Sequence, residues 1–115
     1  MKKLLISIII LTAFNIPVRS QDTNYRESYL AAESYFLFEE YNEALPLYLR
    51  INRKSPNNDD INYKIGVCFL NNPYEKEKSI VYLENAVKNI NPKYKENNYK
   101  ETGAPLESLF YLANA

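Results

Sequence analysis

Apolar side chains recur every three or four positions along most of the chain beyond Asp22, which is the spacing of one face of an α-helix. The segment 24–40 shows this first, with Tyr25, Tyr29, Ala32 and Phe36 in one stripe. The same spacing continues in the segments 42–54, 60–70, 74–90 and 104–115. No segment alternates apolar and polar residues over a useful length, so strands are not expected. The pattern predicts an all-α chain of five helices.

Capping and helix-breaking residues separate these segments. Asn42 is placed to cap the second helix, which would put Pro46 near the first turn, where few amides have an intrahelical partner. Pro56 ends that helix, and Asp59 or Asp60 is expected to cap the third.

The segment 91–103, NPKYKENNYKETG, is polar and carries no apolar stripe, so a loop is expected there. Pro105 follows it and suits the first position of the last helix.

Residues 1–20 have the layout of a secretory signal peptide. Lys2 and Lys3 precede an apolar run of about 11 residues, and a spanning helix needs roughly 20. Ser20 suits cleavage before Gln21, and an uncleaved membrane anchor is the alternative. No cysteine follows the run, which disfavours a lipid-anchored lipoprotein. We therefore expect an exported protein with its helical region at 21–115.

Charge and cysteine content narrow the classes of partner. All 14 acidic residues but only 11 of the 14 basic ones lie beyond Ser20, so the mature chain would be 3 units negative. Without a long basic run, nucleic acid is not an expected partner. Cys68 is the only cysteine and has apolar neighbours, so a buried core thiol is expected.

Few side chains in the sequence are of the types that usually carry out catalysis. The chain has no histidine, and the adjacent carboxylates at Glu39-Glu40 and Asp59-Asp60 lie where helices end or begin, as ordinary caps or solvated charges do. Beyond Ser20 only Gly66 and Gly103 are glycines, so there is no phosphate-binding glycine loop. We expect no enzyme activity, no metal and no cofactor.

The helices also repeat in pairs. Ala32 precedes Gly66 by 34 residues, and Ala44 in the following helix corresponds to Ser79. Small residues at these places would let paired helices approach closely, with the large side chains Tyr35, Tyr48, Phe69 and Leu83 filling the space beside them.

This pattern resembles the tetratricopeptide repeat (TPR) family, whose period is 34 residues. The resemblance implies a TPR-like α-solenoid over 21–115, with two full repeats and the start of a third, which stops at Ala115. Ser28 and Asn62 stand where the family usually has a bulky aromatic residue, and 91–103 is an insertion. Such stacks generally need at least three repeats, so we expect an incomplete chain or one completed by a partner.

The order of features further resembles the amino-terminal repeats of Bacteroidota cell-envelope proteins, on the segments YFLFEEYNEALPLYLRI, NYKIGVCFLN and GAPLESLFYLANA. In that group the repeats precede a β-propeller and an OmpA-like peptidoglycan-binding domain. The resemblance implies a periplasmic or outer-membrane-associated scaffold that binds a peptide or protein partner. Two alternatives remain open: a purely structural segment that packs on later domains or a partner chain, and an outer-membrane glycan-binding component.

In the TPR arrangement the first helices of successive pairs line a concave groove. Carried over to this chain, the groove residues are Tyr29, Glu33, Phe36, Tyr63, Val67, Leu70, Phe110 and Asn114. Tyr29, Tyr63 and Phe110 occupy matching places and could form a row of aromatic platforms, or could pack on neighbouring helices. Tyrosines stand where some family members use lysine to hold a peptide carboxylate, so that clamp is not expected.

Overall fold

The computed structural model describes residues 20–115, with side chains from Asn24 onward. The predicted signal segment 1–20, apart from Ser20 itself, lies outside the described residues. The described α-helices are α2 (Ser20–Leu37), α3 (Tyr41–Lys54), α4 (Asp59–Leu70), α5 (Ser79–Val87) and α6 (Glu107–Ala113), and a short 3₁₀ helix, η2 (Lys76–Lys78), precedes α5.

The prediction of an all-α chain is confirmed for residues 20–115. That range contains no strand, and its one β-type feature is an isolated parallel bridge between Ile90 and Ala104. None of the helices described there has both the length and the hydrophobicity that crossing a bilayer requires.

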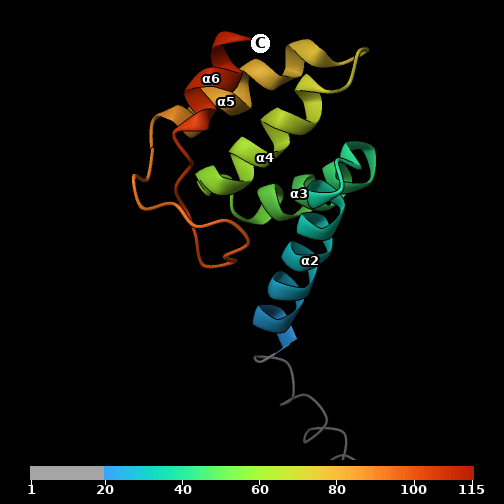
Figure 1. Ribbon diagram of the computed structural model, residues 1–115. Coiled ribbons are helices and arrows are strands. Elements are labelled where there is room, and N and C mark those ends of the chain that lie inside the picture. Colours follow the sequence, from blue (N-terminus) through green and yellow to red (C-terminus); the bar gives the residue numbers. More distant parts are fainter. Residues whose placement is uncertain (1–19) are drawn as a thin grey trace, which may run out of the picture.

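Helices that follow one another along the chain pack against one another, from α2 on α3 through to α5 on α6 (Figure 1). The central helix is α4, which contacts α3, α5, η2 and α6. Every residue from Asp60 to Phe69 is buried, so α4 has almost no solvent face. A helix that is covered on all sides in this way anchors the elements around it.

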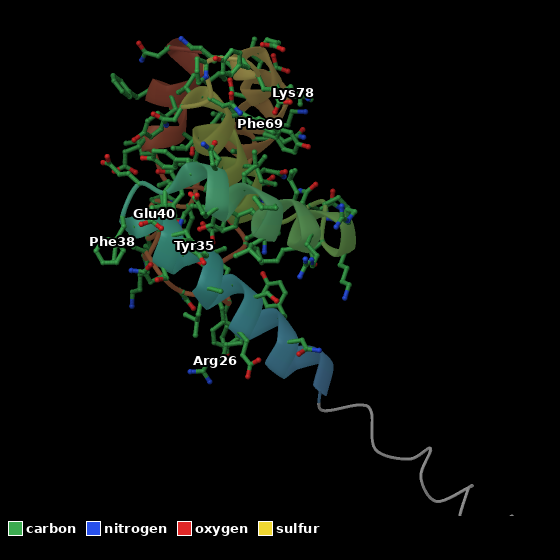
Figure 2. All side chains as sticks on the ribbon, turned by 90° about the vertical axis from the view of Figure 1, so that its right-hand side faces the viewer. Arg26, Tyr35, Phe38, Glu40, Phe69 and Lys78 are labelled. Carbon is green, nitrogen blue, oxygen red and sulfur yellow. The ribbon has the colours of Figure 1, made fainter. Side chains whose placement is uncertain are left out.

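Small residues lie at the helix contacts where the sequence placed them. Ala32 on α2 and Ala44 on α3 are fully buried in one core cluster. On α4, a Cβ at Gly66 would lie 2.5 Å from Leu83 Cγ on α5, so the glycine permits the close approach of these two helices. Tyr48, Phe69 and Leu83 are buried as expected. Tyr35 is not: it is 39% exposed near the α2–α3 turn, beside the exposed Phe38 (Figure 2).

The start of α3 differs from the prediction. The helix begins at Tyr41, so Asn42 is inside its first turn and does not cap it, and Glu40 precedes the helix without a side-chain cap. Pro46 therefore lies in the second turn, where the amide it lacks would have bonded the Asn42 carbonyl. Asn42 is exposed, so water can satisfy that carbonyl.

Two other helix starts also need correction. Asn58 caps α4, because its side-chain oxygen accepts a hydrogen bond from the Ile61 amide; Asp59 and Asp60 lie in the first turn instead. The last helix, α6, begins at Glu107, so Pro105 lies before it and not at its first position. At α4, Asn58, Asp59 and Asp60 are all of residue types that cap helices, so residue type alone does not identify the cap.

Candidate functional site

The polar segment 91–103, which we call the covering loop, connects α5 to α6 and begins and ends at the same place. Its two ends are joined at the Ile90–Ala104 bridge, where the Asn91 amide donates to the Ala104 carbonyl (2.8 Å) and the Ala104 amide to the Asn89 carbonyl (2.9 Å). The prediction of a loop is confirmed. In Figure 1 the loop, in orange, runs from the end of α5 past α4 toward α2 before it returns to α6.

Beneath the loop lies what we call the α2–α4 face, formed by Tyr29, Glu33, Asp60, Tyr63 and Lys64. All five side chains are buried. Its central interaction is an ion pair between Lys64 Nζ and Glu33 Oε1 at 2.5 Å, with the lysine fully buried. Isolated buried charges are strongly unfavourable, so each member of this pair depends on the other.

Neighbouring side chains complete the surroundings of the ion pair. The Tyr48 hydroxyl donates a hydrogen bond to Glu33 Oε1 at 2.6 Å from the α3 side. Lys64 Nζ also lies 4.7 Å from the centre of the Phe36 ring, within the range of a cation–π contact. One charged pair thereby connects α2, α3 and α4.

Asp60 holds the second charged position, one helical turn before Lys64. Its carboxylate accepts hydrogen bonds from the Tyr29 hydroxyl (2.9 Å) and the Tyr94 hydroxyl (2.5 Å). Burial raises the pKa of Asp60 to about 6, although Lys64 and the two phenols oppose that rise. The expectation of an ordinary cap or solvated charge is wrong for Asp60, because the covering loop and α2 exclude water from it.

The tyrosines around these carboxylates act as donors only. Burial raises the pKa of Tyr29, Tyr48 and Tyr94 far above the ordinary range, and the nearby Asp60 or Glu33 carboxylate raises each further. Their hydroxyls stay protonated at any physiological pH. The phenol donors beside Asp60 and Glu33 therefore do not titrate in the physiological range.

The covering loop contacts the α2–α4 face mainly through side chains. Tyr94 adds an edge-on contact to the Tyr63 ring, with centroids 6.4 Å apart, to its hydrogen bond with Asp60. Glu96 lies 3.6 Å from Lys64 Nζ. Farther along, Arg26, labelled on α2 in Figure 2, lies 5.3 Å from the centre of the Tyr99 ring. The Thr102 carbonyl accepts from the Asp59 amide at 2.9 Å.

The eight predicted groove residues differ widely in exposure. Four of them are buried: Tyr29 (0%), Val67 (2%), Glu33 (4%) and Tyr63 (5%). Phe36 and Leu70 are half-buried, and Phe110 and Asn114 are exposed. The first two helix pairs therefore present no open groove at these positions, because the covering loop and neighbouring helices fill it.

The predicted aromatic row is also arranged differently. Tyr29 and Tyr63 belong to separate core clusters. The α6 ring beside Tyr63 is Tyr111, with centroids 6.0 Å apart, whereas Phe110 is 65% exposed and contacts Tyr111. Phe110 and Tyr111 are adjacent on α6. Because adjacent residues of a helix point about 100° apart, only one of them can face Tyr63.

Sequence reasoning missed Asp60, Lys64 and Tyr94. A signal for the first two exists: they are spaced four residues apart on a helix whose other residues are mostly apolar, so both must share one side of it. No comparable signal marks Tyr94, which lies in a segment without periodicity. Its role depends on where the loop folds back.

The thiol and the metal-ligating side chains are the remaining reactive groups among the described residues. Burial raises the pKa of Cys68 to about 12, so its thiol stays protonated and unreactive, and its expected burial is confirmed. No group of three or more metal-ligating side chains gathers among the residues that were placed.

No protein-family model matches the chain, and neither a curated protein nor a solved structure shows significant similarity to it.

Proposed function

We propose that this chain is an exported, TPR-like helical module of the bacterial cell envelope that binds a peptide or protein partner through the α2–α4 face. The observation that carries the proposal is the pair of buried charges on α4, Asp60 and Lys64, which lie beside the predicted groove residues Tyr29, Glu33 and Tyr63. A purely structural helix contact would be served by apolar side chains, since a buried ion pair is rarely more stable than a hydrophobic replacement.

The repeat arrangement is supported by the packing of small residues. Ala32 and Ala44 are fully buried in the first pair of helices, and Ser79 is fully buried in the second. Gly66 meets Leu83 closely in that second pair. Export is supported by the basic and apolar pattern of residues 1–20.

The α2–α4 face has the features of a peptide-recognition site. It combines an anion at Asp60, a cation at Lys64 and aromatic surface at Tyr63 and Phe36. Fixed charges set the register and orientation of a ligand, while aromatic rings supply contact area. The covering loop already makes both kinds of contact with this face.

The experiment is a selection of random displayed peptides on the purified chain lacking residues 1–20, followed by hydrogen-exchange mapping of each bound peptide. We expect altered exchange in residues 29–36, 59–64 and 91–103. The double variant Glu33→Gln/Lys64→Met, which removes both charges together, should lose binding, and Lys54→Met, at an exposed lysine on α3, should not. Peptides that map only to α3 and α5, or no binders at all, would contradict the proposal.

A second candidate is structural, and exposed apolar side chains on α6 favour it. Leu109 is 49% exposed and Phe110 is 65% exposed, next to the 67% exposed Leu106. Such a patch suits a covering element, either from the same protein or from a partner chain. If Phe110→Ser abolishes binding of the covering element to α6 and leaves peptide binding at the α2–α4 face unchanged, α6 has this structural role.

A further inference from the structure

We propose that the covering loop is an internal ligand: it occupies the α2–α4 face in place of a partner segment that presents a tyrosine and, two residues later, a carboxylate. This inference rests on the function proposed above and specifies the partner's chemistry. It follows from what the loop itself places on the face, Tyr94 on Asp60 and Glu96 on Lys64.

The first step concerns the chemistry of the face. Asp60 accepts two phenol hydrogen bonds, of which Tyr29 supplies one from α2 and Tyr94 supplies the other from the loop. Lys64 has Glu33 as one anionic neighbour and Glu96 as a second. The helices therefore provide one partner for each charge, and the loop adds a second that is not built into the helical framework.

The second step concerns how the loop is attached. Its base is held by the Ile90–Ala104 bridge and by Glu101, whose carboxylate accepts from Asn91 Nδ2 at 2.8 Å. These contacts lie within the loop and its ends, so they persist when the rest of the loop lifts. Between the base and the face, the backbone contributes a single hydrogen bond, from the Asp59 amide to the Thr102 carbonyl.

The third step concerns the stability of the covered state. Seven side chains of the loop remain exposed, namely Pro92, Lys93, Lys95, Glu96, Asn97, Lys100 and Thr102, and its apolar contacts with the helices come from two rings, Tyr94 against Tyr63 and Tyr99 against the core. Segments with few buried apolar contacts open locally at a small fraction of the global unfolding free energy. Lifting the loop leaves α5 and α6 joined at its base and uncovers Asp60, Tyr63 and Lys64 for an incoming peptide.

The partner's chemistry follows from the contacts that must be replaced. A phenol hydroxyl restores the hydrogen bond to Asp60, and its ring restores the edge-on contact with Tyr63. A carboxylate two positions later restores the charge beside Lys64. A phenylalanine in place of the tyrosine would leave Asp60 with one donor fewer in a buried position, which disfavours it.

The test uses the chain without residues 1–20 and a fluorescent peptide with the sequence of residues 91–103, NPKYKENNYKETG. The variant Tyr94→Ser/Glu96→Gln, which we call the anchor variant, removes the loop's contacts with Asp60 and Lys64 and should bind this peptide at least about tenfold more tightly than the unaltered chain does. The matched control Lys93→Gln/Lys95→Gln changes exposed side chains of the same loop and should bind like the unaltered chain. Fluorescence anisotropy measures all three affinities.

Altered peptides test the chemistry. Replacing the peptide residue that corresponds to Tyr94 by Phe, or the one that corresponds to Glu96 by Gln, should weaken binding to the anchor variant severalfold. If the anchor variant loses its helical circular dichroism, Tyr94→Phe, which removes only one hydroxyl, replaces it and should still bind the native peptide more tightly than the unaltered chain.

Equal affinity of the anchor variant and the unaltered chain for the peptide would overturn the inference. So would equal binding of the native and altered peptides. If selected library peptides occupy the α2–α4 face but lack the tyrosine and carboxylate, the internal-ligand inference fails and the proposed function stands. If nothing binds the face in either experiment, both fail.

Discussion

Lys64 and Asp60 are charged side chains with no exposed surface, one turn apart on α4. Burying a charge is unfavourable unless partners replace the lost water. Glu33 pairs with Lys64, and Tyr29 and Tyr94 donate to Asp60. Among the side chains that the structure describes, only Ser108 Oγ is buried without a hydrogen-bond partner, so this polar cluster is fully satisfied. Removing one member should therefore be more harmful than removing a pair.

The substitution Lys64→Met tests this expectation. It leaves Glu33 buried beside an apolar side chain, and we expect the free energy of unfolding to fall by about 3 kcal/mol or more. The double variant Glu33→Gln/Lys64→Met leaves no buried charge at the pair and should recover most of that loss. Urea denaturation followed by circular dichroism measures each value. A double variant no more stable than Lys64→Met would show that the pairing does not account for the effect.

Asp60 makes stability depend on pH. Its pKa is raised from 3.8 to about 6 in the folded chain, chiefly by burial, so between these values the folded state holds a proton that the unfolded state releases. The resulting stabilisation is fully present below about pH 4 and is lost as the pH rises through about 6, by about 3 kcal/mol in total. Glu33, Lys64, Tyr29 and Tyr94 are the groups facing Asp60, and the tyrosines stay neutral throughout.

The measurement compares the unaltered chain with Asp60→Asn. The free energy of unfolding of the unaltered chain, relative to that of the variant, should decrease between pH 4 and pH 7 by about 2 kcal/mol, which is most of the total. A constant offset between the two curves reflects the altered hydrogen bonds and does not bear on the titration. Parallel curves over this range would contradict a raised pKa at Asp60.

At the scale of elements, the contact of α4 with α5 depends on one missing side chain. A Cβ at Gly66 would lie 2.5 Å from Leu83 Cγ and 2.6 Å from Leu83 Cδ2. Leu83 is fully buried, and close-packed cores leave few voids for a displaced side chain. Interdigitated helices transmit such a clash to their relative position, since close-packed cores do not yield locally.

Gly66→Ala should therefore destabilise the chain. Alanine gains about 1 kcal/mol over glycine in helix propensity, but overpacking costs about 1–3 kcal/mol, and with Leu83 confined we expect a net loss. Combining it with Leu83→Ala removes the clash, so the two substitutions should be clearly non-additive. Ser34→Ala, at an exposed position of α2, is the control and should change stability by less than about 0.5 kcal/mol. If the stability changes of the two substitutions simply added, the contact of residue 66 with Leu83 would not be the cause of the destabilisation.

At the scale of the whole molecule, the helices form a stack in which most backbone packing joins sequence neighbours, and side chains of α2 also contact α4 through the Glu33–Lys64 pair and the Tyr29–Asp60 hydrogen bond. The central α4 touches four other elements and is buried along most of its length. By contrast, α6 lies at one end of the described chain, packs against α5 and α4, and carries exposed apolar side chains. Stability in such a stack is unevenly distributed, because each unit depends on its neighbours.

Hydrogen exchange should report this gradient. Amides of α4 should exchange slowest, at rates near those of global unfolding, and amides of α6 and the covering loop should exchange fastest among the described segments. Exchange measured by mass spectrometry on peptides covering 59–70, 91–103 and 107–113 gives the comparison. Equal protection of α4 and α6 would indicate a single cooperative unit with no weak end.

Much of the helical framework could be predicted from periodicity and from small residues. Ala32, Ala44 and Gly66 could be located because a close helix contact requires a small side chain wherever it occurs. Helix starts were predicted less well: at α4 the cap is Asn58, although Asp59 and Asp60 are equally able caps by type. Local propensity ranks these residues alike, and the contacts around each one decide between them.

The candidate site was predicted only in part. Helical periodicity was enough to locate the side of the helix on which Tyr29 and Tyr63 lie, the α2–α4 face. Both are buried, however, because the covering loop and neighbouring side chains fill the space in front of them. Asp60 was expected to be an ordinary cap or a solvated charge and is instead enclosed. Nothing local to residue 60 specifies this, since the enclosing Tyr94 comes from a segment 34 residues farther along the chain.

The sequence by itself determined that the chain is helical and where helices can approach one another, because periodicity and side-chain size act over a few residues and leave a readable pattern. Only the tertiary structure decided that a polar loop folds back over α2 and α4, and with it which charges are buried. Loop placement has no period, and its free energy comes from a few long-range contacts such as Tyr94 with Asp60. These contacts become apparent only once the elements are arranged in space.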